Sequence, residues 1–255
     1  MDKNNSEKQT TQSNQKEEIS RRNFIKKAGL VTGGIIGSGL IGGIIGNQWW
    51  TGTENDVVNE TAPDFSEARV FFNRREDFSV LSWTTERILP EDDNGPGAIA
   101  LGVPYFIDKQ LAGAWGNNTD EYMKGPFIEG EDTQGFQSAL NRGEIFIQGI
   151  RKITEVSKNE FGDSFEELDE EQQIEVLTMF ENGEIELQGV GSDTFFNMLI
   201  QGTLEGAYSD PLYGGNRNMD GWRMKEYPGP QSSYINVIEK EEFNFMDPIS
   251  LSNYN

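Results

Sequence analysis

The stretch SDTFFNMLIQGTLEGAY, residues 192–208, carries the pattern that decides the fold class of this chain. Its apolar side chains recur at intervals of three and four residues, which is the period of an amphipathic helix. Ser192 and Asp193 introduce the run as residue types found at helix starts. The side chains expected to face the core are Phe195, Phe196, Leu199, Ile200 and Leu204. The stretch therefore predicts a long, half-buried helix.

Four further segments show the same helical period. They are residues 79–89, 98–115, 136–156 and 168–180. Ser79 is a residue type that caps helices and Pro90 cannot continue one, so these residues are expected to bound the first segment. Pro104 interrupts the second segment, where the helix is expected to kink or to start afresh. Because no run sustains the alternation of a strand, the fold class that we predict is all-α. It is an irregular helical domain with long loops rich in aromatic residues, glycine and proline.

Residues 203–230, TLEGAYSDPLYGGNRNMDGWRMKEYPGP, contain too many glycines and prolines for one regular element. Four aromatic residues are spread through them: Tyr208, Tyr213, Trp222 and Tyr227. Rigid aromatic side chains with one polar group are typical of protein contact surfaces. They are equally typical of a loop that folds onto its own helices and uses the rings to fill gaps. The residue types alone support the two interpretations equally.

The chain contains no cysteine and no histidine. Disulfides, thiolate-bound zinc or iron–sulfur clusters and haem attached through Cys-x-x-Cys-His are therefore excluded within this chain. Nucleophiles activated by histidine are excluded as well. The turn EDDNGPGA, residues 91–98, has acids and glycines that could suit calcium, but it lacks the ligand spacing of an EF-hand. We predict no catalytic residue, no metal site and no cofactor in this chain.

The charge is strongly acidic outside the N-terminal region. Residues 46–255 hold 14 Lys and Arg against 39 Asp and Glu, a net charge of −25. Such a surface repels phosphate backbones, which argues against nucleic acid as a partner. An anionic substrate would be repelled too, unless a local pocket reverses the field.

Residues 20–50, SRRNFIKKAGLVTGGIIGSGLIGGIIGNQWW, join a basic motif to an uncharged apolar run. The motif resembles a twin-arginine export signal, which it matches at Ser20, Arg21, Arg22, Phe24, Ile25 and Lys26. The alternative is a plain membrane anchor with basic flanks. An A-x-A cleavage pattern does not follow the run, so an uncleaved N-terminal helix in the membrane is also consistent with the sequence.

These patterns divide the chain into four parts. Residues 1–19 are polar and are expected to form a disordered cytoplasmic leader. Residues 20–50 form the signal and apolar segment, and residues 51–63 form a polar spacer. Residues 64–255 are expected to form one helical domain with an extended C-terminal tail.

Three segments carry a family resemblance. They are ERILPEDDNGPGAIALGVPYFIDKQLAG at 86–113, EYMKGPF at 121–127 and EGAYSDPLYGGNRNMDGWRMKEYPG at 205–229. Together they resemble the gluconate 2-dehydrogenase subunit 3 family, over residues 70 to 230. Residues 235–255 lie outside the resemblance, and we expect them to wrap around a partner through Phe243, Phe245 and Tyr254.

The resemblance implies the non-catalytic small subunit of an exported, FAD-dependent gluconate or sugar dehydrogenase complex. A separate large subunit of the GMC type would hold FAD and oxidise the alcohol, and in many such complexes a cytochrome c subunit passes the electrons on. The large subunit would cross the membrane bound to this chain through the twin-arginine translocase. The complex would then lie in the periplasm or at the outer face of the cytoplasmic membrane. The residues to which the resemblance assigns partner binding are Glu205, Tyr208, Asp210, Pro211, Tyr213, Gly214, Gly215, Asn216, Trp222 and Tyr227.

Two other functions fit the same residues. One is a membrane-tethered, exported binding module that has no dehydrogenase partner. The other is a hydrolase that uses paired carboxylates, such as Asp92 with Asp93 or Glu205 with Asp210. In a chain with 43 acidic residues, such pairs also arise by chance.

Overall fold

The computed structural model describes residues 67–128, 135–235, 237–240 and 245–253. All of them belong to one compact unit, residues 42–255. The export motif at residues 20–26, the apolar run and the spacer lie outside the described residues, so the predictions about them stay predictions. None of the helices in the described ranges is both long and apolar enough to cross a membrane.

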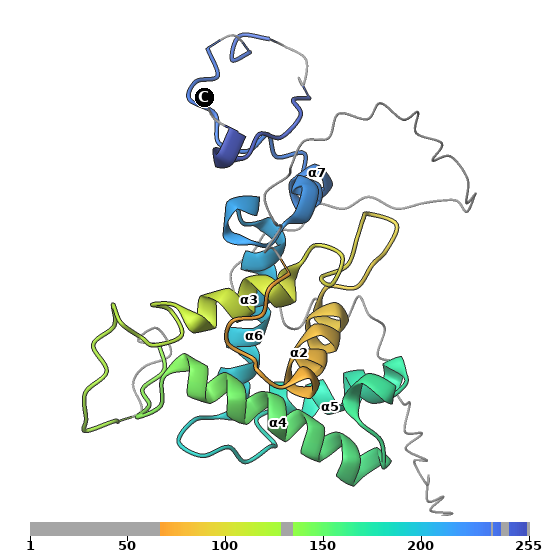
Figure 1. The fold of residues 1–255 in the computed structure, drawn as a ribbon, viewed down its shortest axis with the longest axis vertical. Helices are drawn as coiled ribbons and strands as arrows, with labels where there is room; N and C mark the ends of the chain where they lie inside the picture. Colours follow the sequence, from red (N-terminus) through yellow and green to blue (C-terminus); the bar gives the residue numbers. More distant parts are fainter. Residues whose placement is uncertain (1–66, 129–134, 236, 241–244, 254–255) are drawn as a thin grey trace, which may run out of the picture. The chain divides into compact units, whose positions relative to one another are not determined.

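The fold is all-α, as predicted, and strands are absent from the described residues. The helices are α2 (Arg75–Ile88), α3 (Val103–Ala112), α4 (Arg142–Phe161), α5 (Glu170–Glu181), α6 (Ser192–Tyr208) and α7 (Asp220–Met224). Short 3-10 turns lie between several of them. Helix α6 packs against α2, α3, α4, α5 and α7 and is the common neighbour of the bundle (Figure 1).

The N-terminal half of α6 supplies the centre of the core. The side chains of Phe195, Phe196 and Leu199 are buried, as the helical period predicted. The ring of Phe195 meets the ring of Phe146 from α4 edge-on, with 5.6 Å between centroids, and the ring of Phe180 from α5 at 5.9 Å. Three helices are therefore joined through one aromatic cluster.

The prediction for Leu204 is wrong, since 41 % of this side chain is exposed. In this half of α6 the buried positions are held by Gly202, Thr203, Gly206 and Ala207. A Cβ at Gly206 would lie 2.9 Å from Cδ1 of Phe106 on α3. Helix α3 thus approaches α6 too closely for large side chains, and Leu204 faces outward.

The predicted helix boundaries agree with the structure at some ends and differ from it at others. Helix α5 begins after Asp169, whose carboxylate accepts the Gln172 N–H at 2.9 Å in a capping box. Pro104 does start a helix afresh, because it lies in the first turn of α3 after Gly102, whose φ is +76°. Ser79 is not a cap, since α2 begins four residues earlier, at Arg75.

Helix α4 also differs from its prediction. It begins at Arg142 instead of residue 136 and continues to Phe161. Asn141 and Glu144 form a capping box in which each side chain accepts the other residue's backbone N–H at 2.9 Å. Residues 135–141 are irregular, so their apolar side chains gave a false helical signal.

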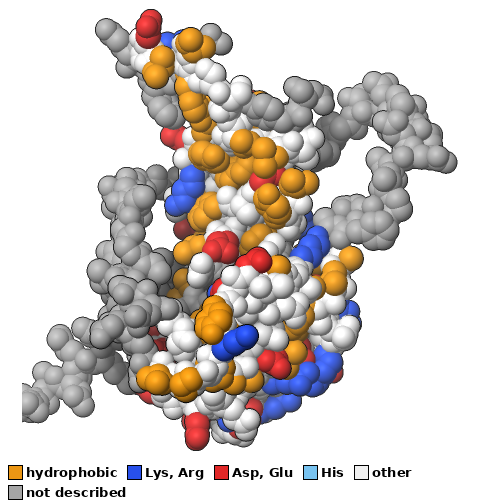
Figure 2. Space-filling model, turned by 90° about the vertical axis from the view of Figure 1, so that its left-hand side faces the viewer, with side chains coloured by type: hydrophobic (Ala, Val, Ile, Leu, Met, Phe, Trp, Pro, Cys, Tyr) orange, Lys and Arg blue, Asp and Glu red, His pale blue; other side chains and the backbone are white. Residues whose placement is uncertain are grey.

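Exposed hydrophobic side chains are frequent in the segments that follow α6. Those that are at least 39 % exposed are Leu212, Tyr213, Tyr227, Tyr234, Ile235, Ile238, Phe245, Ile249 and Leu251. Figure 2 shows hydrophobic side chains gathered in the upper part of one face of the molecule. Contiguous apolar surface of this kind is typical of interaction sites.

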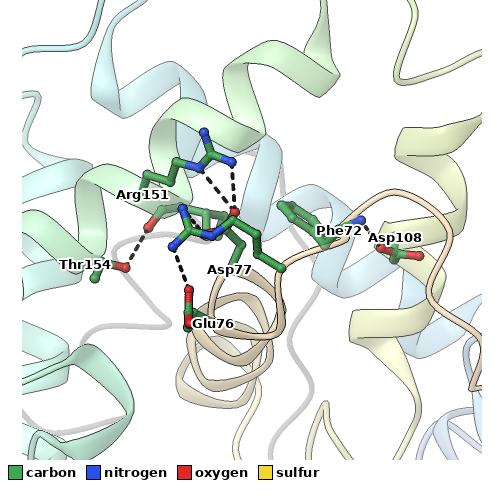
Figure 3. Close-up of polar contacts among 8 residues, drawn as sticks. Phe72, Glu76, Asp77, Asp108, Arg151 and Thr154 are labelled. Atoms are coloured by element: carbon green, nitrogen blue, oxygen red, sulfur yellow. Dashed lines mark hydrogen bonds and ion pairs between the residues drawn. The ribbon is translucent and has the colours of Figure 1, made fainter.

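Two buried carboxylates join elements that are far apart in the sequence (Figure 3). Asp108 on α3 is fully buried and accepts backbone N–H groups from Val70, from Phe71 at 3.2 Å and from Phe72 at 2.8 Å. Asp77 on α2 pairs with the Arg151 guanidinium of α4 at 3.1 Å. Asp108 therefore holds the segment that leads into α2 against the bundle.

We expect Asp108→Asn to lower the free energy of unfolding by about 1 to 3 kcal/mol, because the amide places N–H donors against backbone N–H groups that need an acceptor. Chemical unfolding of the purified chain measures this loss. The exposed Asp163→Asn variant is the matched control and should change stability by less than about 0.5 kcal/mol. Equal losses in the two variants would contradict the role of Asp108.

Candidate functional site

Residues 209–229, which follow α6, fold back onto the end of that helix and are called the returning segment below. The Asp210 carboxylate accepts the Leu212 N–H at 2.9 Å and so caps the 3-10 turn Pro211–Tyr213. Gly214 then turns the chain with a φ of +94°. A Cβ at the next residue, Gly215, would lie 2.1 Å from the carbonyl oxygen of Gly206, so only glycine fits there.

Asn216 fastens this returning segment. It is fully buried, and its φ of +45° is one that asparagine tolerates better than most residues. Its amide nitrogen donates to the Ser209 carbonyl at 2.8 Å, and its Oδ1 accepts the Gly221 N–H at 2.9 Å. One side chain therefore joins the end of α6 to the start of α7.

Trp222 and Tyr227 close the same region. The indole N–H of Trp222 donates to the Tyr208 carbonyl at 2.7 Å, and its side chain is only 5 % exposed. The Tyr227 ring stands nearly perpendicular to the indole, with 5.3 Å between centroids. Tyr227 itself is 45 % exposed, so its ring covers the indole and also faces solvent.

Asp210 binds the C-terminal segment, a role that the sequence analysis missed. Its carboxylate accepts the Ser250 hydroxyl at 2.7 Å and the Leu251 N–H at 2.8 Å, although 40 residues separate it from Ser250. Burial alone would raise the pKa of Asp210, but the hydrogen bonds from Leu251, Ser250 and Leu212 together lower that pKa below its ordinary value of 3.8.

The C-terminal segment therefore packs on this chain, at least over residues 249–251. The Ile249 N–H donates to the Pro228 carbonyl at 3.2 Å. Of the three aromatic residues expected to wrap around a partner, Phe245 is 55 % exposed. Phe243 and Tyr254 lie outside the described residues. Partner wrapping by this tail stays a prediction.

The structure separates the ten predicted partner-binding residues into three groups. Asp210, Gly215, Asn216 and Trp222 are buried and shape the segment. Tyr208, Pro211 and Gly214 are half-buried. Glu205, Tyr213 and Tyr227 are exposed. Some of the aromatic rings thus fill gaps in the fold and others face solvent, so each of the two interpretations fits part of the set.

A pocket of about 450 Å³ lies between α3 and the end of α6. Its lining consists of Phe106, Gln110, Glu205, Tyr208, Ser209 and Tyr213. Leu212, which precedes Tyr213 in the chain, is also exposed. Two of the three exposed members of the predicted set, Glu205 and Tyr213, therefore line this pocket.

In each of the two carboxylate pairs considered for hydrolysis, at least one acid accepts hydrogen bonds within the chain. Asp92 accepts the backbone and side-chain N–H groups of Asn94 at 2.8 and 2.9 Å, which stabilises a turn. Asp210 is occupied by the three hydrogen bonds described above. In the part of the chain that the structure describes, no three acidic residues are grouped as metal ligands.

We expect the contribution of Asp210 to stability to depend on acid. A carboxylate with a lowered pKa stabilises the fold above its unfolded pKa of about 3.9, and this contribution is lost as the pH falls through the folded value. Asp210→Asn should therefore unfold more easily than the unsubstituted chain at pH 7, and the difference should shrink below about pH 4. Unfolding free energies measured across this range test the expectation, with Asp163→Asn as control. A difference that stays constant with pH would contradict it.

Comparison with known proteins gives one match. The family model described as gluconate 2-dehydrogenase subunit 3 matches residues 75–229, which include α2 to α7 and the whole returning segment. Neither a curated protein nor a solved structure was found to match. The matched residues are close to those that carried the resemblance in the sequence. Since they make up more than half of the chain, the protein belongs to the gluconate 2-dehydrogenase subunit 3 family.

Proposed function

We propose that this chain is the non-catalytic small subunit of an exported, FAD-dependent gluconate or sugar dehydrogenase complex. In this proposal it binds the catalytic flavoprotein and escorts it through the twin-arginine pathway. The family is that of a dehydrogenase subunit, and binding, escort and export are the steps that we add. FAD would belong to the large subunit, and a cytochrome c subunit could complete the complex.

The observation that carries the proposal is that residues 205–229 combine buried side chains that hold the backbone with exposed side chains that face solvent. Buried residues such as Asn216 and Trp222 fix the backbone, while Tyr213 is 52 % exposed and Leu212 is 57 % exposed. A surface that is already rigid loses little conformational entropy when a partner binds. Exposed tyrosines on such a surface are typical of binding hot spots. The segment therefore has the physical properties of a contact surface.

The chemistry of the chain supports a role without catalysis. With no cysteine or histidine, the remaining candidates for acid–base chemistry are carboxylates, lysines and tyrosines. The best-placed buried carboxylate of the segment, Asp210, is held ionised by three hydrogen-bond donors. Such a carboxylate is a poor proton donor near neutral pH.

Export is proposed from the motif at residues 20–26. The twin-arginine route accepts folded cargo, which suits a flavoprotein that must bind FAD before it leaves the cytoplasm. On this proposal one signal serves two polypeptides. The complex would lie in the periplasm or at the outer face of the membrane, held there by the N-terminal helix if the signal is not cleaved.

We expect Arg21→Lys with Arg22→Lys to retain both this chain and the flavoprotein in the cytoplasm. Fractionation of cells that express both subunits measures their location. Arg75→Lys is the control, since it changes the same residue type at an exposed position of the folded domain and should leave export intact. Normal export of the flavoprotein with the double variant, or in the complete absence of this chain, would overturn the escort role.

We expect Tyr213→Ala to weaken binding of the flavoprotein by about tenfold or more, as is typical for the loss of a hot-spot tyrosine. Tyr234→Ala is the matched control, because Tyr234 is 43 % exposed and lies outside the family match. Affinity measured with immobilised small subunit compares the two. Equal affinities for both variants would place the contact surface elsewhere.

A further inference from the structure

The pocket between α3 and α6 is lined by an acidic side chain as well as by aromatic ones. Glu205 lies on the wall and belongs to the last turn of α6, which contains no basic residue. The C-terminal end of a helix carries partial negative charge. Gln201 donates to Oε1 of Glu205 at 2.7 Å and so orients the carboxylate. Glu205 and the helix end therefore give this wall of the pocket a negative charge.

A second acceptor lies in the same wall. The hydroxyl oxygen of Ser209 is buried, and it makes no hydrogen bond within the described part of the chain. A buried polar atom without a partner costs free energy, and such atoms are rare in folded proteins. Because Ser209 lines the pocket, a ligand bound there could supply the missing hydrogen bond.

The aromatic rings add a surface on which a cation can stack. Phe106, Tyr208 and Tyr213 all line the pocket. The Lys225 ammonium already lies over the Tyr208 ring, 5.1 Å from its centroid. One face of the Tyr208 ring is therefore already covered by a cation of this chain, and Tyr213, which is 52 % exposed, offers the ring for a further cation.

We propose that this pocket receives an arginine side chain of the catalytic flavoprotein, whose guanidinium binds Glu205 and Ser209 and stacks on the Tyr213 ring. The identity of the partner rests on the proposed function, whereas the choice of arginine rests on the pocket. A guanidinium is planar, presents five donors and stacks on aromatic faces, so it can serve two acceptors and a ring together. A lysine ammonium lacks the planar face. A sugar acid would bring its own carboxylate against Glu205 and is disfavoured.

Two variants test the pocket without disturbing the fold. Glu205→Gln keeps the shape of the side chain and removes its charge, and Ser209→Ala removes a hydroxyl that has no partner in the described structure. We expect Glu205→Gln to weaken flavoprotein binding by about 10- to 100-fold and Ser209→Ala by about 3- to 10-fold. Thermal unfolding of Ser209→Ala should match that of the unsubstituted chain. Glu175→Gln, an exposed charge change on α5, should bind normally.

The binding measurements use full-length small subunit and FAD-loaded flavoprotein. If the unsubstituted chain binds and both pocket variants bind equally well, the pocket proposal is overturned while the proposed function stands. If the unsubstituted chain does not bind at all, the proposed function itself fails.

Photo-crosslinking identifies the occupant. A photoreactive benzoylphenylalanine in place of Gln110, which lines the pocket, should attach to a flavoprotein peptide that contains an arginine, and replacing that arginine by alanine should reproduce the effect of Glu205→Gln. A crosslinked peptide without arginine would overturn the proposal. So would binding of gluconate to the isolated chain that is lost in Glu205→Gln, since the pocket would then be a sugar-acid site.

Discussion

The close approach of neighbouring segments to the second half of α6 is the constraint on which the rest of the structure depends. A Cβ at Gly215 would lie 2.1 Å from the Gly206 carbonyl oxygen, and one at Gly221 would lie 2.0 Å from that of Ala207. This proximity lets the returning segment satisfy carbonyls that a helix end leaves without partners. The Gly206 carbonyl accepts the Asn216 N–H at 2.8 Å, and the Tyr208 carbonyl accepts the Trp222 indole N–H. The glycines are therefore part of the capping of α6.

The same contacts explain how an irregular segment can present a defined surface. Residues 205–229 include only one short α-helix, α7, and would lack a fixed conformation without the buried side chains that tie them to α6. Asp210 extends this framework to the C-terminal segment through Ser250 and Leu251. The exposed Tyr213 thus lies on a backbone held by contacts on both sides. In the proposed complex, a surface built in this way would keep its shape before the partner arrives.

The sequence predicted the helices better than their limits or their mutual contacts. Helical periodicity and the Asp169 cap located α5 well, because both signals are local. The predicted start of α2 was too late, since its N-cap residue Arg74 makes no side-chain capping hydrogen bond and Ser79 offered a false cap. The exposure of Leu204 depends on how closely α3 approaches, which the period of α6 does not encode. The hydrogen bonds of Asp108 to residues 70–72 and of Asp210 to Ser250 and Leu251 span 36 to 41 residues, so no local pattern could reveal them.

The fold of this chain explains only some of the residues that carry the family resemblance. Gly215, Asn216 and Trp222 are each required by a steric or hydrogen-bonding need within this chain. Glu205 and Tyr213 meet no comparable need, since both are exposed and the only described hydrogen bond to the Glu205 carboxylate comes from a neighbouring turn of the same helix. An exposed acid beside aromatic rings and an unpaired hydroxyl does little for the stability of the isolated chain. In the pocket proposed to receive an arginine, the Glu205 carboxylate would pair with the guanidinium and the Tyr213 ring would stack on it.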